Sequence, residues 1–149
     1  MNRAGMRAAA ALAASALSLL LTVACGELEL ITAPPEPEPP PDPSATFTRV
    51  QTEIFTPTCT VIGCHDTFGQ SEGLVLVAGQ AYANLVNRPS TQMPALDRIE
   101  PGDPDRSYLY RKITGTAGTG ERMPAFSPPL PPEQIALIRD WIRRGAPND

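Results

Sequence analysis

The segment Cys59-Thr60-Val61-Ile62-Gly63-Cys64-His65 brings together two thiols and the only histidine of the chain. Two neighbouring thiols can add across the two vinyl groups of a haem, and a histidine directly after the second thiol then lies under the iron as a ligand. The usual attachment motif has two residues between its cysteines, whereas four residues separate Cys59 from Cys64. A longer loop can still span the vinyl groups if it bulges outward, and Gly63 allows the tight turn that this requires.

The two cysteines also permit a different interpretation. In an oxidising compartment, Cys59 and Cys64 can form a small disulfide, which leaves His65 as a surface residue. The chain would then be a haem-free envelope module that acts in binding or as a scaffold.

A haem iron held by His65 needs a second axial ligand, and the sequence offers two candidates. Because the chain has no other histidine, both axial ligands cannot be histidines of one molecule. A methionine thioether is the usual partner in electron-transfer haems. Met93 and Met123 are the candidates outside the N-terminal segment, and each precedes a proline. We favour Met123, since it lies just before the last expected helix, and keep Met93 as the alternative.

Helical patterns surround this motif, and no alternation of apolar and polar residues is long enough to build a sheet. We therefore predict an all-α domain with long loops over residues 44–149. Such a small domain buries little apolar surface, so a cofactor or cross-link is expected to stabilise it. The expected helices are one over residues 45–55, capped by Ser44 and ended by Pro57; one over 80–87; one opened by Asp103-Pro104 and continuing through Lys112; and one from Pro132-Glu133 to Gly145.

The first 43 residues differ in character from the rest. Arg3 and Arg7 precede an apolar run over residues 8–23 that ends in Ala24-Cys25, which is typical of the signal peptide of an exported bacterial lipoprotein. Residues 1–24 are expected to be removed, and the Cys25 thiol to carry the lipid that anchors the chain to a membrane. Residues 25–43 are acidic and rich in proline, so they form an extended spacer.

The charge balance points to no nucleic-acid partner. Five of the 16 acids lie in the linker and two of the 12 bases lie in the signal peptide, which leaves 11 acids and 10 bases in the domain. Such a neutral domain has no strongly basic character. Side chains such as those of Arg111, Lys112 and Arg122 are usually exposed to solvent, but one of them can form an ion pair with a haem propionate.

The domain resembles a class I cytochrome c, and most closely the cytochrome c-like domains of envelope proteins from planctomycetes and myxobacteria. The resemblance covers nearly all of residues 47–149. It is carried by Ile54-Phe55, Cys64-His65, Gly73-Leu74, the segment 81–86, Pro101-Gly102-Asp103, Ser107-Tyr108-Leu109, Met123-Pro124, the segment 138–142 and Gly145-Ala146. The four-residue spacing between the cysteines is the departure from the common pattern.

This resemblance implies a fold in which the first helix and the last helix, with Trp141, cross and enclose one haem c. It implies Cys59 and Cys64 as the covalent attachment sites, His65 as the proximal iron ligand and Met123 as the distal one. It further implies an electron carrier rather than an enzyme, because six-coordinate iron has no open position for a substrate. The expected partners are redox proteins of the cell envelope, and the expected location is the periplasmic face of a membrane, the outer membrane by family habit.

Overall fold

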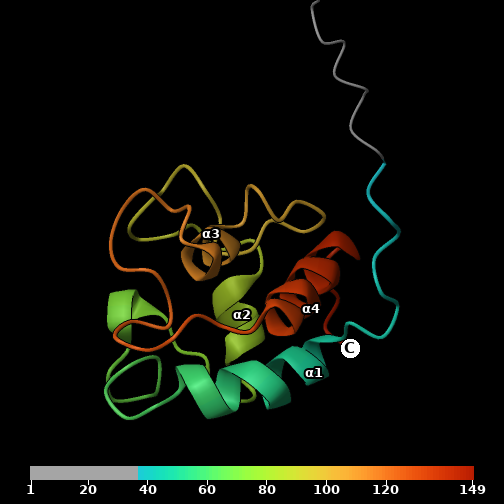
Figure 1. The fold of residues 1–149 in the computed structure, drawn as a ribbon. Coiled ribbons are helices and arrows are strands. Elements are labelled where there is room, and N and C mark those ends of the chain that lie inside the picture. The colour runs from blue at the N-terminus through green and yellow to red at the C-terminus, as the bar shows by residue number, and fades with distance from the viewer. Residues whose placement is uncertain (1–36) are drawn as a thin grey trace, which may run out of the picture. The chain divides into compact units, whose positions relative to one another are not determined.

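The structure is a computed structural model that describes residues 37–149. The predicted signal peptide, Cys25 and the first part of the linker lie outside these residues. The residues from Glu38 to Asp149 form one compact unit, in which four α-helices are joined by long loops (Figure 1). No strand occurs within residues 37–149, only isolated bridges such as Val86 with Ile99. The all-α class is therefore confirmed for the described part of the chain.

The first helix is longer than predicted and changes its winding. α1 (Phe47–Val50) continues without a break into the π-helix η1 (Gln51–Cys59). Proline lacks a backbone N–H, and its ring crowds the carbonyl four residues earlier. The wider turn accommodates Pro57, so the prediction that Pro57 ends the helix is wrong. The extension carries Cys59 at its end.

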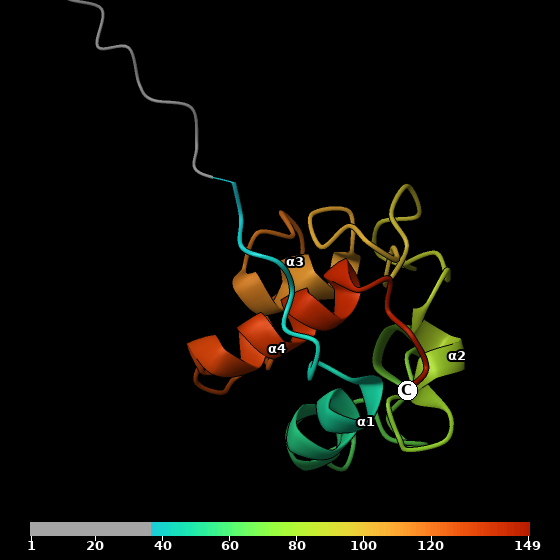
Figure 2. The same cartoon turned by 90° about the vertical axis from the view of Figure 1, so that its right-hand side faces the viewer.

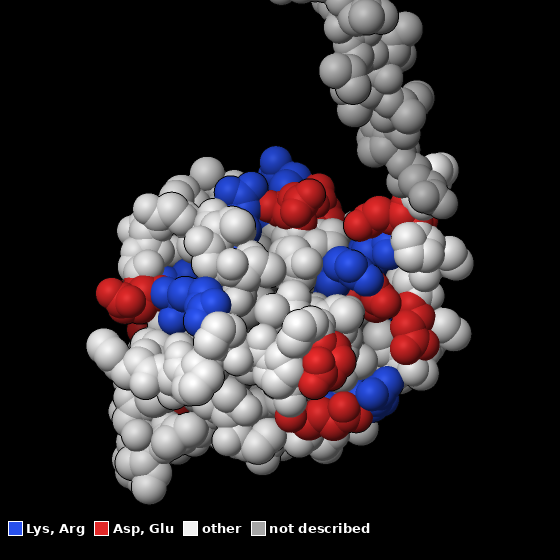
Figure 3. Space-filling model, in the orientation of Figure 1, with Lys and Arg blue, Asp and Glu red and all other residues white. Residues whose placement is uncertain are grey.

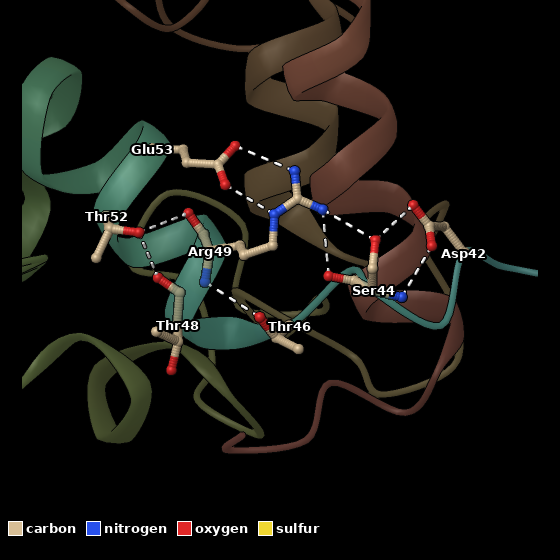
Figure 4. A network of polar contacts seen from close by, with 7 residues as sticks. All are labelled: Asp42, Ser44, Thr46, Thr48, Arg49, Thr52 and Glu53. Carbon is tan, nitrogen blue, oxygen red and sulfur yellow. Dashed lines mark hydrogen bonds and ion pairs between the residues drawn. The ribbon is translucent and has the colours of Figure 1, made fainter.

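Thr46, not Ser44, caps this helix: its hydroxyl accepts a hydrogen bond from the Arg49 amide at 3.2 Å. Ser44 instead bonds Asp42 through both its amide and its hydroxyl, at 2.8 and 2.9 Å. The Arg49 guanidinium joins the two groups of contacts by donating to Ser44 and to the Glu53 carboxylate (Figure 4).

α4 (Pro132–Arg143) agrees with the sequence prediction and ends just before Gly145, whose φ is +92°. It packs against α1, and the two helices lie side by side in both views (Figures 1 and 2). Trp141 is fully buried, and its ring centroid lies 5.4 Å from that of Phe47. The other large, fully buried side chains come from α4 itself and from the rest of the domain: Val50, Ile54, Phe55, Leu85, Ile99, Ser107, Ile138 and Ile142.

Two further short helices, α2 and α3, also contribute side chains to the core. α2 (Ala81–Leu85) lies within the predicted segment. α3 (Tyr108–Thr114) begins later than predicted, after Ser107. The Asp103 carboxylate accepts a hydrogen bond from the Arg106 amide at 3.0 Å, so it caps a turn that precedes the helix rather than the helix itself. A short 3-10 turn, η2 (Ser71–Gly73), lies between η1 and α2. Within residues 37–149, no helix has the length and apolar character needed to cross a membrane.

Candidate cofactor site

The loop between the two cysteines bulges away from the core and then returns. Val61 and Ile62 are exposed on the bulge, and Gly63 has a positive φ of +85°. The Cys64 amide donates to the Val61 carbonyl at 2.9 Å, which closes the turn. The His65 amide then donates to the Cys59 carbonyl at 3.2 Å. The extra residues between the two cysteines therefore lie in the exposed bulge, and the backbone of His65 lies next to the end of η1.

His65 is held by the segment that follows it. Its Nδ1 atom lies 3.2 Å from the Leu74 carbonyl, and its own carbonyl accepts from the Leu76 amide at 2.8 Å. With Nδ1 donating to a carbonyl, Nε2 is the ring nitrogen that keeps a lone pair for a metal, an arrangement usual for metal-bound histidines. Burial lowers the pKa of His65, which favours the neutral ring that a metal ligand must have.

Met123 approaches the same cavity from the loop between α3 and α4. Its amide donates to the Lys112 carbonyl at 2.9 Å, and its side chain is half-buried and packs against the core. The peptide bond to Pro124 is cis. Met93 lies in an earlier loop, where its amide donates to the Ser90 hydroxyl at 3.2 Å.

Three adjoining pockets surround these residues, and His65 and Met123 line all three. Met93 lines none of them. The apolar pocket, of about 50 Å³, is walled mainly by aliphatic side chains of η1, α3 and α4. The cysteine pocket, of about 320 Å³, is bordered by Cys59, Cys64 and the loop from Met123 to Ser127. The third pocket, of about 60 Å³, is called the polar pocket because its lining includes Glu72, Arg98, Tyr108 and Lys112.

Both cysteines are free thiols in the structure. Cys59 is half-buried, and its Sγ lies 3.8 Å from the Ile54 carbonyl. Burial, with a smaller effect of the neighbouring Cys64, raises the pKa of Cys59 to about 12. Cys64 is exposed. The two thiols therefore differ in accessibility, although both border the cysteine pocket.

The structure brings together the site residues that the sequence singled out: Cys59, Cys64, His65 and Met123 all border connected pockets. It also adds two residues that the sequence did not reveal, the Leu74 carbonyl that holds His65 and Arg98 in the polar pocket. Lys112 is only 6% exposed, so the expectation that it is a solvated lysine is wrong. Arg122 is exposed, and the Arg111 guanidinium donates to the Asp105 carbonyl.

Comparisons of this chain with protein-family models, curated proteins and solved structures find no match. Among the described residues, no three histidine, cysteine, aspartate or glutamate side chains form a cluster that could hold a metal ion by themselves.

Proposed function

We propose that this protein is a c-type cytochrome, an electron carrier with one covalently bound haem. Cys59 and Cys64 form the thioether bonds, and His65 and Met123 are the axial ligands. The observation that carries the proposal is that His65 and Met123 line the same connected pockets, which Cys59 and Cys64 border. A thioether and a neutral imidazole are the ligand pair of many electron-transfer haems, so the donor set fits this group.

The chain's own residues supply binding, orientation and exclusion of water. The Leu74 carbonyl fixes the ring of His65, and the Lys112 carbonyl fixes the backbone of Met123. The aliphatic wall of the apolar pocket keeps water away from the site between them; it consists of Ile54, Leu74, Leu76, Leu109, Ile113, Leu130 and Ile138. When bound, the haem supplies a one-electron couple between ferric and ferrous iron. If His65 and Met123 held the haem iron from its two sides, no open position would remain for a substrate, so the chain would transfer electrons rather than catalyse a reaction.

Expression in the presence of a haem-ligation system tests the proposal. The protein should keep its haem on a denaturing gel, because thioether bonds survive unfolding. The Cys59→Ala/Cys64→Ala double variant should lose its haem under the same conditions. Colourless wild-type protein, made beside a control cytochrome that is fully loaded, would overturn the proposal. If that colourless protein also lacks two hydrogens by mass and regains them on reduction, it is the haem-free module with a Cys59–Cys64 disulfide.

A further inference from the structure

The polar pocket contains a buried lysine that has no acidic partner. Lys112 lies in the last turn of α3 and is only 6% exposed. Its Nζ atom lies 3.3 Å from the Thr119 carbonyl. No carboxylate of the described residues lies within ion-pair distance of this ammonium group, whereas Arg49, Arg139, Arg143 and Arg144 all have acidic partners.

The loop after α3 folds over this lysine. A Cβ atom on Gly120 would lie 2.8 Å from the Lys112 Nζ and 3.2 Å from the Gln92 side-chain nitrogen Nε2, so a larger residue would have to displace both groups. The φ of Gly120, +65°, also favours glycine at this position. Burial lowers the pKa of Lys112, because desolvation disfavours the ammonium form. A cation held in this way is stabilised when an anion occupies the neighbouring space.

A second cation, Arg98, lines the same pocket. Its guanidinium donates to three backbone carbonyls, those of Glu72, Gly73 and Asn84, at 2.9 to 3.2 Å, and to no carboxylate of the described residues. Carbonyl partners position the guanidinium without neutralising its charge. The acid of this pocket is Glu72, whose side chain is exposed and forms no ion pair with either cation.

We infer that Lys112, together with Arg98 on the same pocket, binds the carboxylates of the ligand, which for a haem are its two propionates. The inference rests on the proposed function and adds an orientation to it. In this orientation the propionates would be held by the residues of the polar pocket, and the thioether side by those of the cysteine pocket. The Tyr108 hydroxyl donates to the side-chain oxygen Oε1 of Gln92 at 3.0 Å, and Tyr108 lines the same pocket as a further polar group.

Titration of the haem-free, full-length chain with iron mesoporphyrin tests this assignment. Mesoporphyrin has ethyl groups in place of vinyl groups, so no thioether forms and only the non-covalent contacts are measured. The wild type should bind the porphyrin diacid more tightly than its dimethyl ester, as followed by the Soret absorbance. Lys112→Met should weaken diacid binding by about 30-fold or more, the usual effect of removing one member of a buried charge pair, and leave ester binding unchanged.

Two further variants make the test specific. Lys112→Arg keeps the charge and should keep the preference for the diacid. Arg111→Met removes a neighbouring cation of α3 that does not line the polar pocket, and should change neither affinity. Circular dichroism reports whether Lys112→Met is folded; if it is not, the wild type and Lys112→Arg decide the question.

The outcomes separate this inference from the proposed function. Equal affinity of the wild type for diacid and ester, or an equal loss of both in folded Lys112→Met, overturns the role of Lys112 and leaves a haem site. If the wild type binds neither porphyrin, the proposed haem site is itself wrong.

Discussion

Backbone carbonyls position the two axial-ligand candidates at the scale of single residues. The Leu74 carbonyl holds the His65 ring, and the Lys112 carbonyl holds the Met123 amide. Burial lowers the pKa of His65 and so favours the neutral ring, and this effect outweighs the hydrogen bond to the Leu74 carbonyl, which acts in the opposite direction. In the proposed cytochrome, a neutral imidazole and a thioether would stabilise ferrous iron and raise the reduction potential.

The first prediction concerns the distal ligand. Met123→Ala should abolish the weak sulfur-to-iron charge-transfer band of the oxidised protein and lower its reduction potential, because the thioether is then absent from the iron. Met93→Ala is the matched control, since Met93 also precedes a proline but lines none of the three pockets. Visible spectroscopy and redox titration measure both. If the two variants behave the other way round, Met93 is the ligand.

The second prediction concerns the thiols before haem attachment. The thiolate is the form that reacts with iodoacetamide. A pKa of about 12 leaves Cys59 almost wholly protonated at pH 8. In the haem-free, reduced Cys25→Ser variant, we expect alkylation of exposed Cys64 to be much faster than that of Cys59, as measured by peptide mass spectrometry. Equal rates in the native state would contradict the burial of Cys59. Equal rates in denaturant are the control.

At the scale of elements, the sequence predicted the helices that follow a simple apolar period and missed those that depend on backbone adjustment. The pattern of Ile138, Trp141 and Ile142 gave α4 correctly, because its buried face repeats every three to four residues. The apolar pattern could not predict η1, because a π-helix includes Pro57 by widening its turn, whereas the pattern indicates that the helix stops at the proline. Asp103 caps a turn before α3 and not the helix, because a carboxylate can accept a backbone N–H in turns as well as at helix starts.

The candidate site divides in the same way. Cys59, Cys64 and His65 are neighbours in sequence, so a local motif was enough to select them as candidate site residues. Met123 was selected as the candidate distal ligand because it lies just before α4. Lys112 is buried partly because the loop that contains Gly120 folds over it. Arg98 is held at the site by hydrogen bonds to the Glu72 and Gly73 carbonyls, which lie about 25 residues earlier in the sequence. Contacts of this kind have no local sequence signal.

The third prediction concerns the loop that presents the cysteines. A Cβ atom on Gly69 would lie 2.2 Å from the Gly63 carbonyl carbon and 2.6 Å from the Cys64 carbonyl oxygen. These are backbone atoms and cannot move aside as a side chain does. Gly69→Ala should therefore reduce the free energy of unfolding by about 1–3 kcal/mol, the usual cost of overpacking. It should also slow haem attachment, because the bulge between Cys59 and Cys64 is displaced.

Chemical denaturation and the fraction of haem-loaded protein measure the two effects. Thr67→Ala is the control in the same loop, since Thr67 is exposed. An unchanged stability of Gly69→Ala would show that the loop is free to move away from Gly69.

At the scale of the whole molecule, the cysteine end of the site and the linker lie on different sides. Residues 38–44 run along the right of the domain, and the loops around residues 60–70 lie at its left (Figure 1). The end of the linker is attached to α4: the Arg143 guanidinium donates to the Pro39 carbonyl at 2.8 Å and lies 3.6 Å from the Glu38 carboxylate. A membrane anchor at the far end of the linker would thus connect to the side away from the cysteines.

The exposed surface around the cysteines is uncharged and partly apolar. Residues 54–65 and 123–132 contain no lysine, arginine, aspartate or glutamate. Ile62 and Phe68 are 89% exposed and Phe126 is fully exposed. In the space-filling view, the lower left of the molecule carries few charged side chains (Figure 3). Long-range electrostatic attraction is therefore expected to contribute little to the association of a partner protein at this end of the site.

The last prediction concerns the anchor, which depends on Cys25, outside the described residues. An apolar segment that ends in Ala24-Cys25 predicts acylation of the Cys25 thiol followed by cleavage before it. Labelled palmitate should therefore enter the wild type and not Cys25→Ala, and equal labelling of both would refute the anchor. A single acyl chain gives only weak, reversible membrane binding, whereas several chains on one residue hold firmly. The wild type should consequently sediment with membranes, and Cys25→Ala should be recovered in the soluble periplasmic fraction if ordinary signal peptidase still cleaves it. Haem content serves as the internal control, because Cys25 lies far from Cys59 and Cys64 in sequence and its replacement should leave haem attachment unchanged.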